Sequence, residues 1–450
     1  MAGPNGRTIG ALASGLLLGL APPAVAQQRL GLEDALRTAL SRNPSLASAE
    51  ADAAAAGAAR LADWGSLLPT ASASASLSDN RFTNTTFLSP EGVSQRLDNP
   101  ITSTTKSASQ TLTFRMDLLN LGKIGDVRGG GARRGAAELR LTAAERTVVR
   151  DVKKAYFEAL KQTRLTEVAE RQLMARKQDL EVTEQRYRIA AASRSDLLGA
   201  EIDLRDAELR VLDARDAFAT AVRALQTLLA VDVTEASPEE VTLTDVEDIP
   251  DASELDVEAL VARAMRGNPT LAALEADAAA ASASLFTARS AYLPTVSASL
   301  SLGRSEQLGP ADAFFQFSPS NTNRTFSLSA SWSLFNGFSR RRSTARASQS
   351  LRKAESDRAR QSLALEKDVR DLVAQIRRRA RRLEILADNA DLARERLELA
   401  REQYRLGTIA YFNLQQAIDR LNSAEQALFQ ERYDYLSAWA DLEERVGGEM

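Results

Sequence analysis

The sequence predicts an α+β membrane protein in which four β-strands per chain contribute to a shared barrel and long helical hairpins continue from it. Three observations lead to this fold class. The chain of 450 residues is internally duplicated. Each half contains segments that alternate between apolar and hydroxyl side chains, which is typical of strands. Each half also contains a helical stretch far longer than the helices of ordinary globular domains.

The duplication is marked by two motifs that recur in the same order. Asn-Pro-x-Leu-Ala occurs at residues 43–47 and again at 268–272, and Leu-Pro-Thr occurs at 68–70 and again at 293–295. An Ala-rich segment separates the two motifs in each copy, and alternating Ser residues follow the second. A repeat of this length, half a chain apart, indicates two structurally equivalent halves rather than a short-repeat solenoid.

The duplication divides the chain into four parts. Residues 1–26 form a predicted signal peptide, 27–231 the first repeat, 232–254 an acidic equatorial linker, and 255–450 the second repeat. We expect a short helix, two strands and a long helical hairpin in each repeat.

The first residues have the features of an export signal. Arg7 supplies the positive charge, residues 9–20 the short apolar core, and residues 24–26 the Ala-Val-Ala cleavage site. No later segment has the roughly 18 consecutive apolar residues of a transmembrane helix. No cysteine follows the cleavage site, so we expect no lipid anchor.

Four segments alternate with period two and are predicted to be strands, joined in pairs by polar loops at 79–106 and 303–323. The strands are expected at residues 70–78, 111–118, 295–302 and 325–334. One face of each strand is apolar and the other is almost entirely Ser and Thr, which suits lipid outside a barrel and water inside it. The residues expected to line the lumen include Ser72, Ser74, Ser297, Ser299, Ser327 and Ser329.

Four strands cannot close a barrel by themselves. An open strand edge is not tolerated in lipid, because each unpaired backbone N–H or C=O group costs on the order of several kcal/mol there. The chain must therefore share its barrel with copies of itself. Two copies would give eight strands, which pack shut, and three would give twelve, which leave more room inside.

Long helical hairpins are predicted after each strand pair. Helices at residues 124–189 and 340–405 would each span about 100 Å, at about 1.5 Å per residue. Their partners, at 196–229 and 412–446, are about half as long. The Ala-rich helices at 45–65 and 270–291 are expected to stack end to end with these partners and to make up the difference.

Composition argues against an enzyme, a cofactor and a metal centre. Histidine and cysteine are both absent, which removes the usual ligands of zinc, copper and iron–sulfur clusters and excludes a His-dependent triad. Catalysis by carboxylates, Ser/Lys or Tyr stays open. The net charge is -3, and the Arg-rich run at 377–382 lacks interleaved aromatic residues. We interpret that run as a solvated helix face and expect no nucleic-acid partner.

The chain resembles a known family, the TolC-like outer-membrane efflux proteins, also called outer-membrane factors. The resemblance covers nearly the whole mature chain. Its carriers are the duplicated motifs, the segment Trp-Ser-Leu-Phe-Asn-Gly at 332–337, and two hairpin turns at 186–200 and 403–417.

The resemblance implies a passive duct in the outer membrane of a Gram-negative cell. Such proteins are homotrimers, with a shared barrel of twelve strands in outer-membrane lipid and a helical tunnel that extends into the periplasm. They serve tripartite efflux or type I secretion systems, in which a periplasmic adaptor (membrane fusion) protein and an inner-membrane pump or ABC transporter are the partners. The sequence does not identify the cargo.

The same resemblance implies that the two hairpin turns form the periplasmic tip, where the adaptor docks and the tunnel closes. The matching residues are Tyr187, Arg188, Ser195, Asp196, Tyr404, Leu406, Gly407, Asn413 and Gln416. Some family members narrow the entrance with acidic residues where this chain has the neutral Asn413 and Gln416, so an acidic constriction in the second turn is in doubt. Asp196 has two interpretations: it caps a helix, or it contributes a ring of charge at the gate. The first turn has Ala190 where the second has Gly407.

One further function class stays open. The second hairpin has a heptad seam from residue 365 to 404, which is typical of coiled coils. A soluble periplasmic coiled-coil adaptor or structural protein would share this seam. Such a protein would have no need for strands with one apolar and one hydroxyl face.

Overall fold

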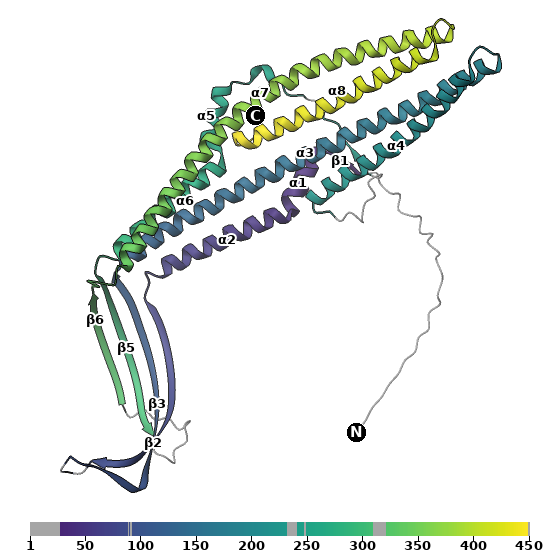
Figure 1. Ribbon diagram of the computed structural model, residues 1–450. Coiled ribbons are helices and arrows are strands. Elements are labelled where there is room, and N and C mark those ends of the chain that lie inside the picture. The colour runs from purple at the N-terminus through teal and green to yellow at the C-terminus, as the bar shows by residue number, and fades with distance from the viewer. Residues whose placement is uncertain are drawn as a thin grey trace, which may run out of the picture.

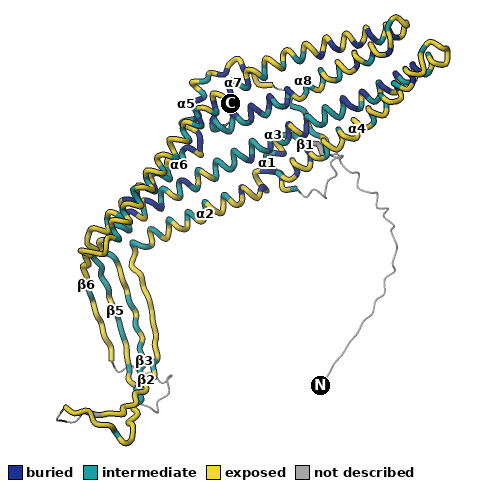
Figure 2. The backbone as a smooth tube through the Cα atoms, in the orientation of Figure 1, coloured by how far each residue is buried: buried dark blue, intermediate teal, exposed yellow. Residues whose placement is uncertain are grey.

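The computed structural model describes residues 28–88, 90, 92–231, 241–246, 249–308 and 321–448. The predicted signal peptide and most of the acidic part of the linker lie outside the described residues. The described chain is elongated, with a β-sheet at one end, two helical hairpins reaching to the other, and short helices between them (Figure 1). Buried residues gather in the helical region, whereas the strands are mostly exposed or half-buried (Figure 2).

The sheet is antiparallel and has four strands in the order β2-β3-β5-β6. Its strands are β2 (Thr70–Leu88), β3 (Ser94–Leu119), β5 (Thr295–Leu308) and β6 (Asn321–Ser331). All four predicted strands are present, but their extents were partly wrong. Most of the polar loop predicted at 79–106 belongs to β2 and β3, which stay paired as far as Asn84 and Ile101 and pair again beyond a register shift. The loop predicted at 303–323 is also shortened at both ends.

The fourth strand ends earlier than predicted. β6 stops at Ser331, and Trp332 turns away so that its indole Nε1 donates a 3.0 Å hydrogen bond to the carbonyl of Tyr292. Gly337 and Phe338 then adopt positive φ angles of 62° and 65°, which a strand does not allow. The apolar and hydroxyl alternation therefore continues past the residue where the backbone leaves the sheet.

The long helices lie within a few residues of their predicted bounds. They are α3 (Leu121–Arg188), α4 (Arg194–Leu228), α7 (Ser339–Arg405) and α8 (Tyr411–Val446). α3 begins where the side chain of Asn120 accepts hydrogen bonds from the backbone N–H groups of Gly122 and Lys123. The predicted seam of α7 is largely buried, with Leu365, Val369, Ile376 and Leu397 each at most 4% exposed.

The Ala-rich helices stack on the hairpin helices, as predicted. α2 (Pro44–Gly65) begins at Asn43, whose amide donates to the carbonyl of Leu228 at the end of α4. α6 (Pro269–Ser290) begins at Asn268, whose amide donates to the carbonyl of Arg445 near the end of α8. α2 and α4 thus continue along one line, and so do α6 and α8 (Figure 1).

The helices form one curved layer. Near the sheet the packed neighbours are α7 with α6, α6 with α3, and α3 with α2; toward the far end they are α7 with α8, α8 with α3, and α3 with α4. This order leaves α7 at one edge of the layer and α2 and α4 at the other (Figure 1). No helix among the described residues has the length and apolar character needed to cross a membrane.

The middle of the chain is held by a small mixed region that the sequence only partly predicts. It contains α1 (Leu32–Arg42), α5 (Val257–Gly267), the short helix η2 (Ala252–Glu254) and a parallel pairing of β1 (Gln28–Leu30) with β4 (Val241–Leu243). The carboxylate of Asp245 accepts hydrogen bonds from Arg164 of α3 at 2.5 Å and from the hydroxyl of Tyr433 of α8 at 3.0 Å. The described part of the linker is therefore fixed to both hairpins.

Candidate functional site: the tip and the barrel wall

The two hairpin turns lie together at the end of the molecule farthest from the sheet (Figure 1). The first turn joins α3 to α4 and the second joins α7 to α8. All nine residues predicted at the tip lie in these turns or within the first or last two helical turns beside them. They are Tyr187, Arg188, Ser195, Asp196, Tyr404, Leu406, Gly407, Asn413 and Gln416.

The backbones of the two turns match in spite of their different residues. Ala190 has a φ of 58° and Gly407 a φ of 76°, so both are left-handed. The N–H of Ala190 donates to the carbonyl of Tyr187 at 3.0 Å, and that of Gly407 donates to the carbonyl of Tyr404 at 3.0 Å. A left-handed conformation costs an alanine about 1–2 kcal/mol that glycine does not incur. The first turn therefore holds a strained residue where the second does not.

Asp196 belongs to a capping box, but it is not the capping residue. Ser193 is the N-cap of α4, and its Oγ accepts from the backbone N–H of Asp196 at 3.1 Å. Asp196 Oδ2 in return accepts from the backbone N–H of Ser193 at 2.9 Å and from its hydroxyl at 2.7 Å. The expectation that Asp196 itself caps the helix is wrong, because the chain enters the helix three residues earlier. Both hydrogen bonds use Oδ2.

Tyr404 joins the two hairpins rather than projecting from the tip. Its side chain is 5% exposed, and its hydroxyl lies 3.2 Å from Thr183 Oγ1 of α3. The guanidinium of Arg186 lies 4.5 Å from the centre of the Tyr404 ring and donates to the Tyr404 carbonyl at 2.6 Å. Thr183 and Arg186 were not among the predicted site residues.

Above this contact, α3 presents a polar seam to the second hairpin. Gln172, Arg176, Asp179 and Thr183 follow a 4-3-4 spacing and are 6%, 6%, 8% and 0% exposed. We call these four residues the polar seam. The positions correspond to those of a coiled-coil core, which apolar residues normally fill. Sequence reasoning missed the seam because it searched these positions for apolar residues; a 4-3 search for polar residues would have found it.

Arg176 is the centre of the polar seam. Its guanidinium donates to Asp419 of α8 at 2.9 Å and lies 3.6 Å from Asp203 of α4. Asp203 also accepts hydrogen bonds from the Tyr411 hydroxyl and the Gln415 amide of α8. Charged hydrogen bonds therefore connect the first and second hairpins here, in addition to the apolar packing of Leu180 and Ala200 against the second hairpin.

Asp179 is one of three members of the polar seam with a buried side-chain atom that lacks a hydrogen-bond partner among the described residues. Its Oδ2 atom has no hydrogen-bond partner in the described part of the chain. Burial raises the pKa of Asp179 above its ordinary value, although the positive charges of Arg176 and Arg401 act in the opposite direction. An ionised Asp179 thus costs stability at this position.

The other predicted tip residues are exposed. Leu406 is 66% exposed and Tyr187 is 40% exposed, and the unpredicted Ile189 and Phe412 beside them are 75% and 63% exposed. Asn413 and Gln416 are exposed as well. The tip of a single chain therefore presents an apolar surface. Neutral polar residues and exposed charged residues, such as Arg188 and Arg405, lie around it.

At the opposite end, the strand register places the predicted lumen residues on one face. Ser72 pairs with Thr113, Ser74 with Thr111, Ser297 with Ser329, and Ser299 with Ser327. Thr113 in turn pairs with Ser301, so one hydroxyl face crosses the four strands. The opposite face is apolar and uncovered.

The apolar face has the exposure of a lipid-facing surface. Leu112, Phe114 and Met116 are each 37% exposed, and Phe326 and Leu328 are 70% and 63% exposed. Contiguous apolar exposure on this scale marks an interaction surface, because soluble chains rarely leave it open. The strand edges β2 and β6 have no partner strand among the described residues.

Comparison with known proteins agrees with this arrangement. The outer membrane efflux protein family matches residues 35–231 and 260–448, which lie in the two repeats. The CmeC outer membrane channel of Campylobacter jejuni aligns over 93% of this chain and 85% of its own, with a TM-score of 0.80 and 16% identity. The outer-membrane channel OprN aligns over 100% and 99%, with a TM-score of 0.79 and 21% identity.

A third neighbour is the open state of the MtrE outer membrane channel of Neisseria gonorrhoeae. It aligns over 97% of this chain and 95% of its own, with a TM-score of 0.74 and 20% identity. Among curated proteins no match is found.

These findings confirm the predicted fold class, with four strands and long helical hairpins per chain that derive from an internal duplication. They do not favour a soluble coiled-coil adaptor. The chain belongs to the outer membrane efflux protein family, and it is an outer-membrane exit duct and not an enzyme.

Proposed function

We propose that three copies of the chain form the duct and that each copy completes its neighbour. The observation that carries this proposal is the pair of open sheet edges, β2 and β6, on a sheet whose outer face is apolar. In lipid such edges must be paired. Three copies would give a twelve-strand barrel with the hydroxyl face inside, lined by Ser72, Ser74, Ser297, Ser299, Ser327 and Ser329.

The edges of the helical layer support the same assembly. α7 exposes apolar residues at a heptad spacing: Ile385, Leu392 and Leu399, at 49%, 64% and 59%. The opposite edge exposes Ile202, Leu209 and Leu212 on α4, and Leu61 and Trp64 on α2. Packing of α7 against α2 and α4 of the next copy would bury both sets and close the layer into a tunnel.

The tip is the proposed gate and docking site. The exposed Tyr187, Arg188 and Ser195 of the first turn, and Leu406, Gly407, Asn413 and Gln416 of the second, would meet a periplasmic adaptor. The adaptor would link the duct to an inner-membrane pump or ABC transporter, which supplies energy and selects the cargo. Asp196 would add one ring of charge, and Tyr404 would hold the two hairpins in the closed arrangement. We further propose that the mature chain carries no lipid anchor.

Engineered disulfides test the assembly directly, because the chain has no cysteine of its own. Leu399→Cys and Ile202→Cys lie at similar distances from the tip on opposite edges of the layer. A disulfide between them should therefore form only between chains and should yield a covalent trimer in detergent.

The matched control is Leu399→Cys alone, which should stay uncrosslinked. A purified protein that is monomeric, or that needs no detergent, would contradict the proposal. Conductance across a planar bilayer, measured on the same sample, reports whether the assembly is open through its length.

A further inference from the structure

The apolar face of the sheet ends abruptly. On β5 the outward positions from Val296 to Leu302 are all apolar, a length of about 20 Å along the strand. This is close to the apolar band of outer-membrane barrels, about 25 Å. The next outward residue is Arg304. On β6 the apolar residues Leu328 and Phe326 are followed, in the same direction away from the helices, by Arg324.

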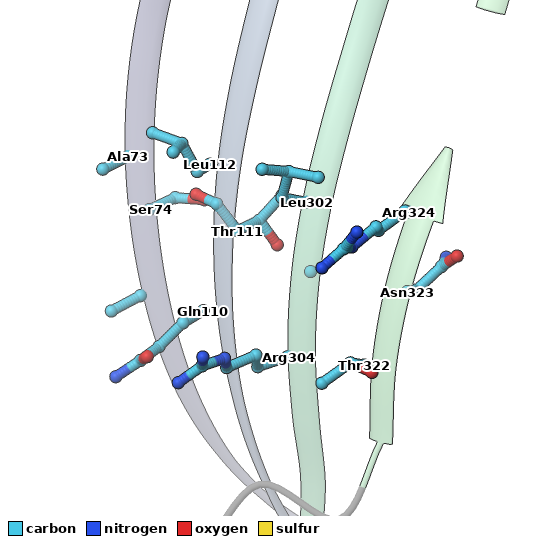
Figure 3. A pocket seen from close by; sticks show the side chains of 12 residues that line it. Ala73, Ser74, Gln110, Thr111, Leu112, Leu302, Arg304, Thr322, Asn323 and Arg324 are labelled. Atoms are coloured by element: carbon cyan, nitrogen blue, oxygen red, sulfur yellow. The ribbon is translucent and has the colours of Figure 1, made fainter. Parts of the chain in front are cut away.

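The two arginines are neighbours on this face. Leu302 pairs with Arg324, and Arg304 pairs with Thr322, so the arginines are diagonal partners on adjacent strands. Diagonal residues of an antiparallel pair lie roughly 7–8 Å apart, within reach of two long side chains. Figure 3 shows Arg324 extending from β6 toward β5, where Leu302 lies, with Leu112 beyond Leu302 on β3. These residues line a shallow hollow of about 660 Å³.

Both guanidinium groups are exposed and are not neutralised within the described part of the chain. No ion pair or side-chain hydrogen bond of the described residues involves Arg304 or Arg324, although most other arginines of the helical region are paired. The nearest charged residues on the same face lie farther from the helices. Glu306 is one row beyond Arg304, and Lys106 and Asp79 are two rows beyond it. Glu306 and Lys106 both have interactions of their own, and Asp79 lies 3.9 Å from Arg81. Two unpaired positive charges thus lie directly at the edge of the apolar band.

We propose that Arg304 and Arg324 form a binding site for the phosphate groups of outer-leaflet lipids. A guanidinium presents a planar fork of N–H donors that matches phosphate oxygens, and it keeps its charge in a low-dielectric surrounding. The phosphates of a lipid lie at the level where the hydrocarbon ends, which is the level of the arginines. Leu112 and Leu302 lie level with Arg324 and on the helix side of Arg304, and they would contact the acyl chains of the same lipid.

The ligand is a phosphorylated lipid rather than free phosphate, because the site combines cationic and apolar residues. A free anion would gain nothing from the leucines. This inference rests on the outward orientation of the apolar face in the proposed barrel.

Native mass spectrometry of the detergent-solubilised full chain can measure lipid binding at this site. The probe is bis-phosphorylated lipid A, compared with its dephosphorylated form and with inorganic phosphate as competitor. Each arginine near a membrane surface contributes about fivefold to the binding of an anionic lipid, so the double variant Arg304→Gln/Arg324→Gln should bind lipid A about 25-fold more weakly. The dephosphorylated lipid should bind both proteins equally, and inorganic phosphate should not compete.

The matched control is Arg115→Gln. Arg115 is an arginine of β3 in the same sheet, but it pairs with Thr70 and Ser299 and therefore lies on the hydroxyl face. Its loss should leave lipid A binding unchanged. Unchanged binding in the double variant, equal loss in the control, or competition by inorganic phosphate would each overturn the inference. A double variant that remains trimeric in detergent shows that such a failure concerns the lipid site alone and not the proposed duct.

Discussion

The side-chain amide of Asn43 donates a 2.9 Å hydrogen bond to the backbone carbonyl of Leu228, the last residue of α4. The same contact recurs in the second repeat, where Asn268 donates to the carbonyl of Arg445 at 3.1 Å. In both places the oxygen of the asparagine accepts a backbone N–H in the first turn of its own helix. One side chain therefore begins a helix and satisfies the end of another.

Because the asparagine has two roles, substitutions can separate the stability contributed by its amide donor from the stability contributed by its capping oxygen. Asn268→Asp keeps the capping oxygen but loses the donor, and it leaves a buried carbonyl unsatisfied, so the free energy of unfolding should fall by about 2 kcal/mol. Asn268→Ala should cost about 1 kcal/mol more, because the cap is lost too. Urea unfolding of the assembled protein, followed by far-ultraviolet circular dichroism, measures both. If Asn268→Asp has the same free energy of unfolding as the wild type, the hydrogen bond between Asn268 and the Arg445 carbonyl contributes nothing to stability.

The turn between α3 and α4 predicts a stabilising substitution. Ala190→Gly should raise the free energy of unfolding of the tip by about 1 kcal/mol, because it relieves the left-handed strain without removing a contact. Gly407→Ala is the matched opposite. A side chain there would lie 3.6 Å from Arg186 Nη2, an ordinary contact, so its cost should be conformational only.

Hydrogen exchange of the tip amides provides the measurement for both turns. Protection in the first turn should increase in Ala190→Gly, and protection in the second should decrease in Gly407→Ala. Changes of equal sign in the two variants would be inconsistent with strain at Ala190.

The capping box allows the two roles of Asp196 to be separated. Ser193→Ala removes the N-cap and should cost about 1 kcal/mol without changing the charge at the tip. Asp196→Asn keeps an oxygen that can accept from Ser193 and removes only the charge. If Asp196 forms a ring of charge in the duct, the asparagine variant should lose cation selectivity in planar bilayers and keep its stability. If cation selectivity is lost in Ser193→Ala and not in Asp196→Asn, the role of Asp196 is purely structural.

Two aspartates, the buried Asp179 and the half-buried Asp245, predict opposite responses to acid. The pKa of Asp179 is raised by burial, so its protonation favours the folded state, and stability should be gained as the pH falls through its folded pKa. For Asp245, burial acts to raise the pKa, but the hydrogen bonds from Arg164 and Tyr433 outweigh it and the pKa is lowered. The stability that ionised Asp245 contributes is fully present when the pH is above the ordinary pKa of an aspartate, and it is lost as the pH falls through the lowered pKa of the folded state.

Asp179→Asn should therefore be more stable than the wild type at pH 7, with a difference that shrinks toward pH 4. Asp245→Asn should be less stable at pH 7, with a difference that shrinks on further acidification. Thermal unfolding across this pH range measures both differences. Parallel responses of the two variants would contradict the opposite environments assigned to the aspartates.

Much of this architecture could be predicted because local signals and the global fold agree. Asn-Pro motifs at 43–44 and 268–269 start helices, and a heptad seam from Leu365 to Tyr404 identifies the second hairpin. The strand ends were wrong for a physical reason. Beyond Leu77 the outward residues of β2 become polar, which resembles a loop, yet the backbone stays paired because only the membrane band requires apolar residues.

The candidate site was predicted less completely than the fold. The tip residues were identified by resemblance, but the polar seam was invisible because Gln172, Arg176 and Asp179 are side chains normally assigned to the surface. The burial of Arg176 depends on a partner, Asp419, that lies more than two hundred residues away in the sequence. The pairing of β1 with β4 was missed because three residues carry no periodicity.

The open edges β2 and β6 have a genetic consequence. A copy in which one of the two edges cannot pair would still pair with normal copies through its other edge. Every barrel that contains such a copy would fail to close. If half of the subunits in a cell carried such a defect, only about one-eighth of randomly mixed trimers would be sound. Defects at these edges should therefore be dominant over a normal allele, whereas defects that prevent a single chain from folding should be recessive.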